Sequence, residues 1–131
     1  MTLGVRGIAL DAAERVLLVR HTYLAGWHLP GGGVERGETA EEAMRKEFAE
    51  EGGVAVEGPL RLCHVYLNPH FRGDHILLYQ AETWRPCASD SLGEIAECGF
   101  FPRDALPEGV RPHVARRLSE VLEGAAPSPF W

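Results

Sequence analysis

The residues of this sequence best suited to chemistry are three glutamates, Glu47, Glu50 and Glu51. Spaced i, i+3 and i+4, they would share one face of a helix, where like charges destabilise it by roughly 0.2–0.5 kcal/mol per pair. Two of them would also fall in the last turn, where the helix dipole disfavours anions. Oxygen clusters of this kind suit hard cations such as Mg²⁺ or Mn²⁺. The spacing therefore predicts a divalent metal site, and a solvated surface of glutamates is the alternative.

A short helix from Ala40 to Glu51 is predicted to carry these glutamates, with a glycine-rich turn before it. Thr39 is a good N-cap residue, and Glu42 three positions later completes a capping box. Two glycines follow the helix, and glycine adopts the left-handed C-terminal conformation without strain. The glycines at 31–33 predict a loop whose backbone approaches an oxyanion or a metal closely. Glu38 stands where this loop meets the helix and is close enough to join the cluster.

This stretch resembles the signature of the Nudix hydrolases, G-x5-E-x7-R-E-U-x-E-E-x-G-U, in which U is bulky and apolar. So many specified positions make a chance match improbable. The segments W-H-L-P-G-G-G and E-I-A-E-C-G-F-F on either side are also similar to the family. The one departure is Lys46, which stands where the family has arginine. The matching positions are, in order, Gly32, Glu38, Glu47, Phe48, Glu50, Glu51, Gly53 and Val54.

The resemblance implies a fold, a reaction and a set of ligands. The fold would be α/β, a Nudix-like α/β/α sandwich with a mixed β-sheet between helices. The reaction would be attack of water on a phosphorus of a nucleoside diphosphate linked to another group X, helped by Mg²⁺ or Mn²⁺. Glu38 would bind metal or brace the loop. The metal ligands implied are Glu47, Glu50, Glu51 and the backbone carbonyl of Gly32.

The general base is left open by the resemblance, since family members place it on the helix or on a loop before the last strand. Glu50 and Glu51 are the helix candidates. Glu94 and Glu97 lie near the loop, and Glu94 fits the family position better. Lys46 keeps the charge of the family arginine and loses its planar fork. It is expected to brace the helix by pairing with Glu42 or Glu50, each four residues away.

The substrate is expected to be a small nucleotide, and three residues are candidates to bind it. His28 lies between Trp27 and Leu29 and must face away from both if the segment is extended. Tyr66 sits on a predicted strand and Arg72 in a turn, although core packing and solvation are the plainer interpretations. Pro69 resembles a marker of the ADP-ribose branch of the family.

The remaining alternatives concern which nucleotide is used and whether it is hydrolysed at all. A nucleotide sugar, a nucleoside triphosphate and a dinucleotide polyphosphate all stay open. A catalytically silent Nudix-like sensor that binds nucleotide is the alternative function. Such a domain would be expected to have lost acidic positions of the signature, and here all are kept.

The elements that position these residues follow from the hydrophobic pattern. Two strands joined as a hairpin are expected first, then three further strands and a second helix. The segment after that helix, residues 124–131, is expected to be a loosely ordered tail. The predicted strands are Leu3–Leu10, Arg15–Arg20, Leu60–Leu67, His75–Thr83 and Ile95–Phe101, and the second helix is Pro112–Glu123.

Composition sets the remaining expectations. The 131 residues are typical of one domain, taken as residues 1–131. The net charge of −6 argues against general nucleic-acid binding, and no apolar stretch reaches the length of a membrane span. Three cysteines without metal-type spacing favour a reducing, cytoplasmic location. A monomer or a homodimer is expected.

Overall fold

The computed structural model describes residues 1–90 and 93–131. It places the strands in two sheets, one with the order β4-β1-β6-β5 and one with the order β3-β2-β7. The first sheet is mixed, because β1 is parallel to β6 while the other neighbours are antiparallel. The elements are β1 (Thr2–Ala9), β2 (Val16–His21), β3 (Trp27–His28), β4 (Gly31–Gly33), α1 (Ala40–Gly52), β5 (Val54–Leu67), β6 (Asp74–Pro86), β7 (Ile95–Phe101) and α2 (Pro112–Leu122).

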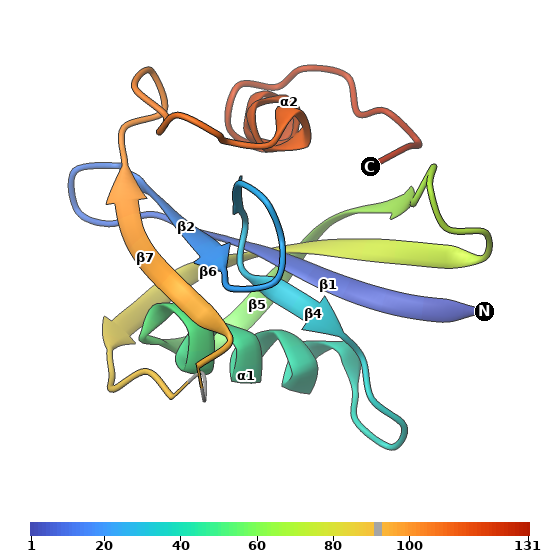
Figure 1. Ribbon diagram of the computed structural model, residues 1–131, viewed down its shortest axis with the longest axis horizontal. Helices are drawn as coiled ribbons and strands as arrows, with labels where there is room; N and C mark the ends of the chain where they lie inside the picture. Colours follow the sequence, from blue (N-terminus) through green and yellow to red (C-terminus); the bar gives the residue numbers. More distant parts are fainter. Residues whose placement is uncertain (91–92) are drawn as a thin grey trace.

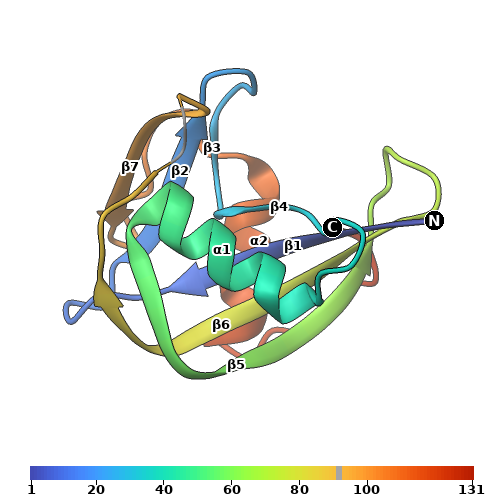
Figure 2. The ribbon, with the colours of Figure 1, turned by 90° about the horizontal axis from the view of Figure 1, so that it is seen from below.

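The two helices lie on opposite sides of the strands (Figures 1 and 2). A hydrophobic core lies on each side, and side chains of β1 alternate between the two. Val5 and Ala9 pack in the core that contains Met44 and Phe48 of α1. Ile8 packs in the core that contains Val114 and Leu118 of α2. The predicted α/β/α arrangement with a mixed sheet is therefore confirmed. Among the described residues, neither helix is long and apolar enough to cross a membrane.

Helix α1 begins and ends where local signals predict. The Thr39 hydroxyl accepts from the backbone N–H of Glu42, whose carboxylate accepts from the N–H of Thr39. Gly53 closes the helix in the left-handed conformation, with φ of 65°. These contacts fix the helix that carries the glutamates, one residue longer than expected.

The first two strands do not form the expected hairpin. They belong to different sheets, and a single bridge between Leu10 and Val16 joins their ends. The reason is that β1 already has two neighbours, β4 and β6. The expected loop at Gly31–Gly33 is the strand β4, which pairs with β1. At Gly31 a Cβ atom would lie 1.9 Å from the carbonyl oxygen of Val5, so only glycine allows this approach.

The segment after α2 is not a loosely ordered tail. The N–H of Leu67 donates to the carbonyl of Pro129 (2.8 Å), and the N–H of Trp131 donates to the carbonyl of Leu67 (3.0 Å). Phe130 thereby forms a parallel bridge with the end of β5. Figure 1 shows this segment in red, returning from α2 toward the strands. Backbone pairing, which sequence patterns do not reveal, orders it.

Candidate active site

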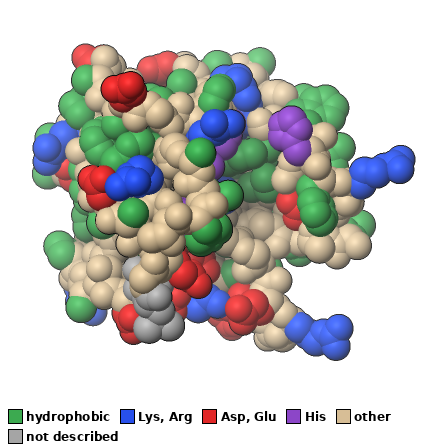
Figure 3. Space-filling model, in the orientation of Figure 1, with side chains coloured by type: hydrophobic (Ala, Val, Ile, Leu, Met, Phe, Trp, Pro, Cys, Tyr) green, Lys and Arg blue, Asp and Glu red, His purple; other side chains and the backbone are tan. Residues whose placement is uncertain are grey.

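Four carboxylates gather where α1 ends, from two parts of the chain. Burial, together with the negative charges of Glu51, Glu50 and Glu94, raises the pKa of Glu47 to about 7, while the charge of Lys46 opposes the shift. The loop before β7 is attached to the end of β2, because the backbone carbonyl of Glu94 accepts from the N–H of Thr22 (2.9 Å). In Figure 3, acidic side chains gather on the lower part of the face shown. The structure therefore brings together the predicted helix glutamates and Glu94.

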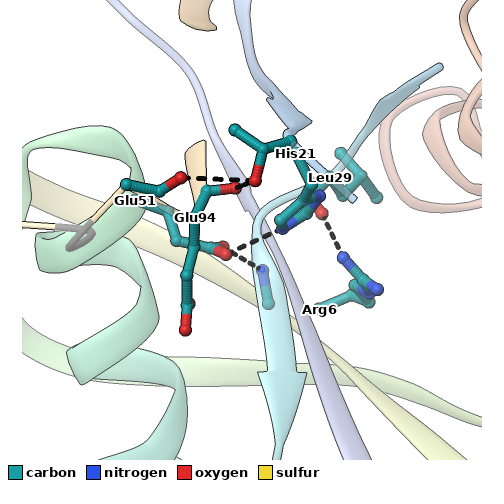
Figure 4. Close-up of polar contacts among 8 residues, drawn as sticks. Arg6, His21, Leu29, Glu51 and Glu94 are labelled. Atoms are coloured by element: carbon teal, nitrogen blue, oxygen red, sulfur yellow. Dashed lines mark hydrogen bonds and ion pairs between the residues drawn. The ribbon is translucent and has the colours of Figure 1, made fainter. Parts of the chain in front are cut away.

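Glu51 is the most firmly held of these carboxylates (Figure 4). Its side chain is buried, and Oε1 accepts from the backbone N–H of Gly31 (2.8 Å). Oε2 lies 2.9 Å from Nε2 of His21, which is also buried. A carboxylate can only accept, so His21 donates from Nε2. Nδ1 of His21 has no hydrogen-bond partner within the described part of the chain. Glu51 thus joins α1 to β4 and to the end of β2.

The oxygen donors beside Glu47 fit a hard divalent cation. A Cβ atom on Gly32 would lie 3.1 Å from Oε1 of Glu47, so the backbone of β4 runs directly beside that carboxylate. Within residues 1–90 and 93–131, no three His, Cys, Asp or Glu side chains already converge closely enough to hold an ion. The mutual repulsion of these carboxylates is relieved by a cation that draws them together. Metal ligation by Gly32, Glu38, Glu47, Glu50 and Glu51 stays a prediction.

Lys46 does not pair with the residues expected for it. Its Nζ lies 3.3 Å from Oε2 of Glu38 and 3.9 Å from Oε2 of Glu35, in the loop before α1. Glu42 is engaged in the capping box. Glu38 also accepts from the N–H of Glu35 (2.8 Å), and this bond, with Lys46, holds the pKa of Glu38 below its usual value. Lys46 and Glu38 therefore brace the loop against the helix, which is the second of the two roles expected for Glu38.

A cleft leads away from the carboxylates across β1 and β6. It consists of two cavities of about 450 and 480 Å³, which share Arg6, Asn68 and Ile76 in their walls. The first cavity includes Gly32 and Gly33 of β4 and is therefore next to Glu47. The second reaches α2 and the segment after it. Its other lining residues include His28, His70, Arg111, His113, Arg116 and Trp131.

Arg6 is the cation at the junction of the two cavities. Its Nη1 donates to the carbonyl of Leu29 (2.8 Å). Burial lowers the pKa of Arg6, and the negative charges of Glu51 and Glu47 counteract that effect, so these carboxylates act on the guanidinium electrostatically. His28 lines the cleft, with Trp27 and Leu29 buried in the core as expected. Burial lowers the pKa of His28 to about 4, and Arg6 contributes to the shift.

Two of the other candidates are placed away from this cleft. Tyr66, predicted to bind substrate, is fully buried, and its hydroxyl donates to Oε1 of Glu120 (2.6 Å). That prediction is wrong, because the strand directs this ring into the core under α2. Arg72 is exposed in the turn between β5 and β6 and is not among the residues that line the two cavities. Glu97 pairs with Arg20, which leaves Glu94 as the loop carboxylate nearest to Glu47.

Sequence reasoning missed several residues that the fold brings to the site. A charged residue inside the apolar pattern of β1 was a usable signal for Arg6. No local signal marked the others, because the strands and segments that bring them together are far apart in the sequence. The missed residues are Arg6, His21, Tyr23, Asn68, His113 and Trp131.

Millimolar Mg²⁺ is expected to raise the melting temperature, and more at pH 8 than at pH 6. The pKa of Glu47 is raised from 4.5 to about 7, so its contribution to metal-free stability is present at low pH and is lost as pH rises through 7. Discounted for solvent exposure, this loss is about 1–2 kcal/mol, or a few degrees. A bound cation offsets the loss by stabilising the folded state.

Thermal unfolding at both pH values, with and without Mg²⁺, measures this effect. Glu47→Gln is the matched control, and it should flatten the pH dependence of the metal-free protein. Equal melting temperatures with and without Mg²⁺ at both pH values would contradict the metal site.

Comparison with known proteins agrees with this geometry. A family profile described as the NUDIX domain matches residues 1–122. A Bacillus subtilis protein named "Putative 8-oxo-dGTP diphosphatase" is 31% identical over 124 residues, which cover 95% of this chain and 82% of that protein. The 8-oxo-dGDP phosphatase of Mus musculus is 30% identical over 126 residues, with 89% of this chain and 37% of that protein covered.

A solved structure leads to the same conclusion. The crystal structure of a MutT NUDIX hydrolase from Burkholderia pseudomallei superposes with a TM-score of 0.74 at 26% identity. The match covers 92% of this chain and 97% of that one. Together with the signature on α1 and the layered fold, these similarities show that the chain belongs to the Nudix family of hydrolases.

Proposed function

We propose that this protein is a pyrophosphohydrolase that depends on Mg²⁺ or Mn²⁺ and cleaves a nucleoside diphosphate linked to another group X. One observation carries the proposal: the half-buried Glu47 lies among three other carboxylates, against the backbone of Gly32, at one end of a cleft. Crowded carboxylates destabilise a fold when they stand alone. They are favourable as ligands of a divalent cation that also binds the phosphates of a substrate.

The helix residues are assigned to the metal and the loop carboxylate to the water. Glu47, Glu50 and Glu51 would hold the cation with the carbonyl of Gly32. When bound, such an ion neutralises charge on phosphoryl oxygens and acidifies water. Glu94 is exposed at the mouth of the site. We assign it as the general base, which accepts a proton as water attacks phosphorus and the bridging P–O bond breaks, with Glu50 and Glu51 as alternatives.

The cleft supports one orientation of the substrate. Arg6 lines both cavities and interacts electrostatically with Glu51 and Glu47, so it would neutralise phosphate oxygens held beside them. The nucleoside would then extend along the second cavity toward His28. Pro69 lines the same cavity. This proline resembles a marker of ADP-ribose enzymes and supports ADP-ribose as a substrate. The relatives named for 8-oxo-dGTP and 8-oxo-dGDP support oxidised purine nucleotides, so these two classes are the leading candidates.

Cellular location follows from the cysteines. Cys63, Cys87 and Cys98 are free thiols in the structure. Free thiols are usual in reducing compartments, so we place the enzyme in the cytoplasm, acting on small nucleotides.

A substrate panel with phosphate release as the readout tests the proposal. The panel contains 8-oxo-dGTP, 8-oxo-dGDP, dGTP, ADP-ribose and a nucleotide sugar, each with Mg²⁺, Mn²⁺ or EDTA. Inorganic pyrophosphatase is added for the triphosphates, whose cleavage releases pyrophosphate. A phosphomonoesterase is added for ADP-ribose and the nucleotide sugar, which have no terminal phosphate of their own. Metal-dependent turnover of at least one substrate is expected. Saturable binding without turnover would support a nucleotide sensor instead, and neither binding nor turnover would overturn both assignments.

A further inference from the structure

We propose that Trp131 is the residue on which the nucleobase of the substrate stacks, and that a buried network centred on Arg117 holds it in place. The proposal rests on the function proposed above and deepens it, because it assigns the second cavity to a purine. Trp131 lines that cavity and does not line the first cavity, which contains Gly32 beside Glu47. It comes from the segment after α2, which the signature on α1 does not include.

The network joins α2 to that segment through charged hydrogen bonds. Arg117 is fully buried, and its Nη1 donates to the carbonyl of Phe130 (2.8 Å). Its Nη2 donates to Oε2 of Glu120 (3.0 Å), which also accepts from the N–H of Ser128 (3.0 Å). Tyr66 donates to the other oxygen of Glu120. Two of these bonds hold the backbone of the segment directly.

Burying the charges of this network is unfavourable for stability, and its contacts with Trp131 indicate that it positions the indole. Removing two charges from water is unfavourable, and apolar residues often fill such sites with equal or greater stability. The guanidinium of Arg117 lies 4.5 Å from the centre of the Tyr66 ring and 5.5 Å from that of Trp131. The network therefore fixes the position of the indole by its backbone and by its ring.

The surroundings of the indole suit a purine. Its ring centre lies 5.0 Å from that of His113, which lies 5.7 Å from that of His28. Burial lowers the pKa of His113 to about 3 and that of His28 to about 4, so both imidazoles are neutral at pH 7. His28 donates from Nε2 to the carbonyl of Ala25 (3.0 Å), which leaves Nδ1 as an acceptor, and a neutral His113 has one donor and one acceptor for the polar edge of a base. Every base has a π-face that can stack on an aromatic side chain, and such stacking contributes substantially to binding affinity.

The two cavities of the cleft can bind the phosphates and the base of one nucleotide separately. Arg6 lines both cavities, with the carboxylates on one side and His28 on the other. A nucleotide with its phosphates at Arg6 directs its base into the second cavity, toward Trp131. The arrangement predicts that Trp131 affects base-containing ligands and not phosphate alone.

Trp131→Ala and Trp131→Phe in the full chain test this assignment, with Phe130→Ala as the matched control. Phe130 belongs to the same segment, its ring is 51% exposed and does not line the cavity, and its carbonyl is kept in the variant. The readouts are KM and kcat for dGTP and ADP-ribose, the inhibition constant of tripolyphosphate, and dissociation constants of the two nucleotides by calorimetry.

Trp131→Ala is expected to raise the KM and the dissociation constant for at least one nucleotide by about 5- to 100-fold. It should leave kcat within about twofold and the inhibition constant of tripolyphosphate unchanged. Trp131→Phe should recover most of the affinity, and Phe130→Ala should behave as the parent.

Three results would overturn the proposal. One is an equal loss of affinity for nucleotide and tripolyphosphate, which would show that Trp131 only supports the fold. The second is parental affinity for both nucleotides in Trp131→Ala, and the third is no binding of either nucleotide to the parent. Calorimetry keeps this test separate from the proposed hydrolysis, because a parent that binds nucleotide without turnover still reports on Trp131.

Discussion

Glu50→Gln is expected to lower kcat by about 10³-fold or more while leaving the protein folded. Its carboxylate contributes to the charge around Glu47, and a lost metal ligand removes several kcal/mol of stabilisation of the reacting phosphoryl group. Glutamine has nearly the same shape and removes one negative charge from the cluster. The free energy of unfolding of the metal-free protein should therefore stay the same or rise.

The matched control is Glu41→Gln, which makes the same charge change in the first turn of the same helix. Initial rates with the best substrate of the panel, over a range of Mg²⁺ concentrations, measure the effect, and chemical denaturation checks the fold. Turnover of Glu50→Gln within tenfold of that of Glu41→Gln would show that the carboxylate cluster does not carry the reaction.

Local chemistry explains why the helix of the site was predictable. Thr39, Glu42 and Gly53 act within one turn of the helix ends, so their effect can be inferred from spacing alone. The spacing of Glu47, Glu50 and Glu51 likewise needs only the helical period. Any sequence with these signals in this order is expected to present its carboxylates on one face.

Local sequence patterns predict where strands form but do not determine which strands pair with one another. The apolar residues of Leu3–Leu10 and Arg15–Arg20 predict two strands correctly, but the expected hairpin is wrong because β1 pairs with β4 and β6. The glycines 31–33 predict a loop by type, but they form a strand because they pair with β1, and at Gly31 this pairing leaves no space for a Cβ atom. Each decision involves residues far apart in the chain.

The same distinction explains the errors at the site. The helical period predicts a partner for Lys46 four residues away on its own helix, whereas the loop before the helix supplies Glu38 and Glu35. The position of Tyr66 on a strand makes it a substrate candidate, but strand alternation does not tell which face of the strand is covered by α2. Arg6 and Trp131 reach the cleft only through the folded topology.

His21→Leu is expected to weaken Mn²⁺ binding by about 10–100-fold, the usual effect of losing a group that orients a metal ligand. Nε2 of His21 lies 2.9 Å from Oε2 of the buried Glu51. Leucine removes that donor and leaves the carboxylate with the N–H of Gly31 as its remaining bond in the described structure. The buried carboxylate of Glu51 then lacks one of its two donors, which costs about 1–3 kcal/mol of stability.

His21→Gln separates the two effects, because its amide nitrogen is the same number of bonds from Cα as Nε2 of histidine. A donor in that place can still hold Glu51 in the orientation that Gly31 also favours. Glutamine should therefore recover most of the Mn²⁺ affinity, measured by electron paramagnetic resonance of the free ion at a temperature where all three proteins are folded. Parental Mn²⁺ affinity in the leucine variant would contradict the role, since it would show that Glu51 keeps its orientation through Gly31 and α1 alone. A loss shared equally by both variants would show that the packing of the imidazole, and not its hydrogen bond, positions the carboxylate.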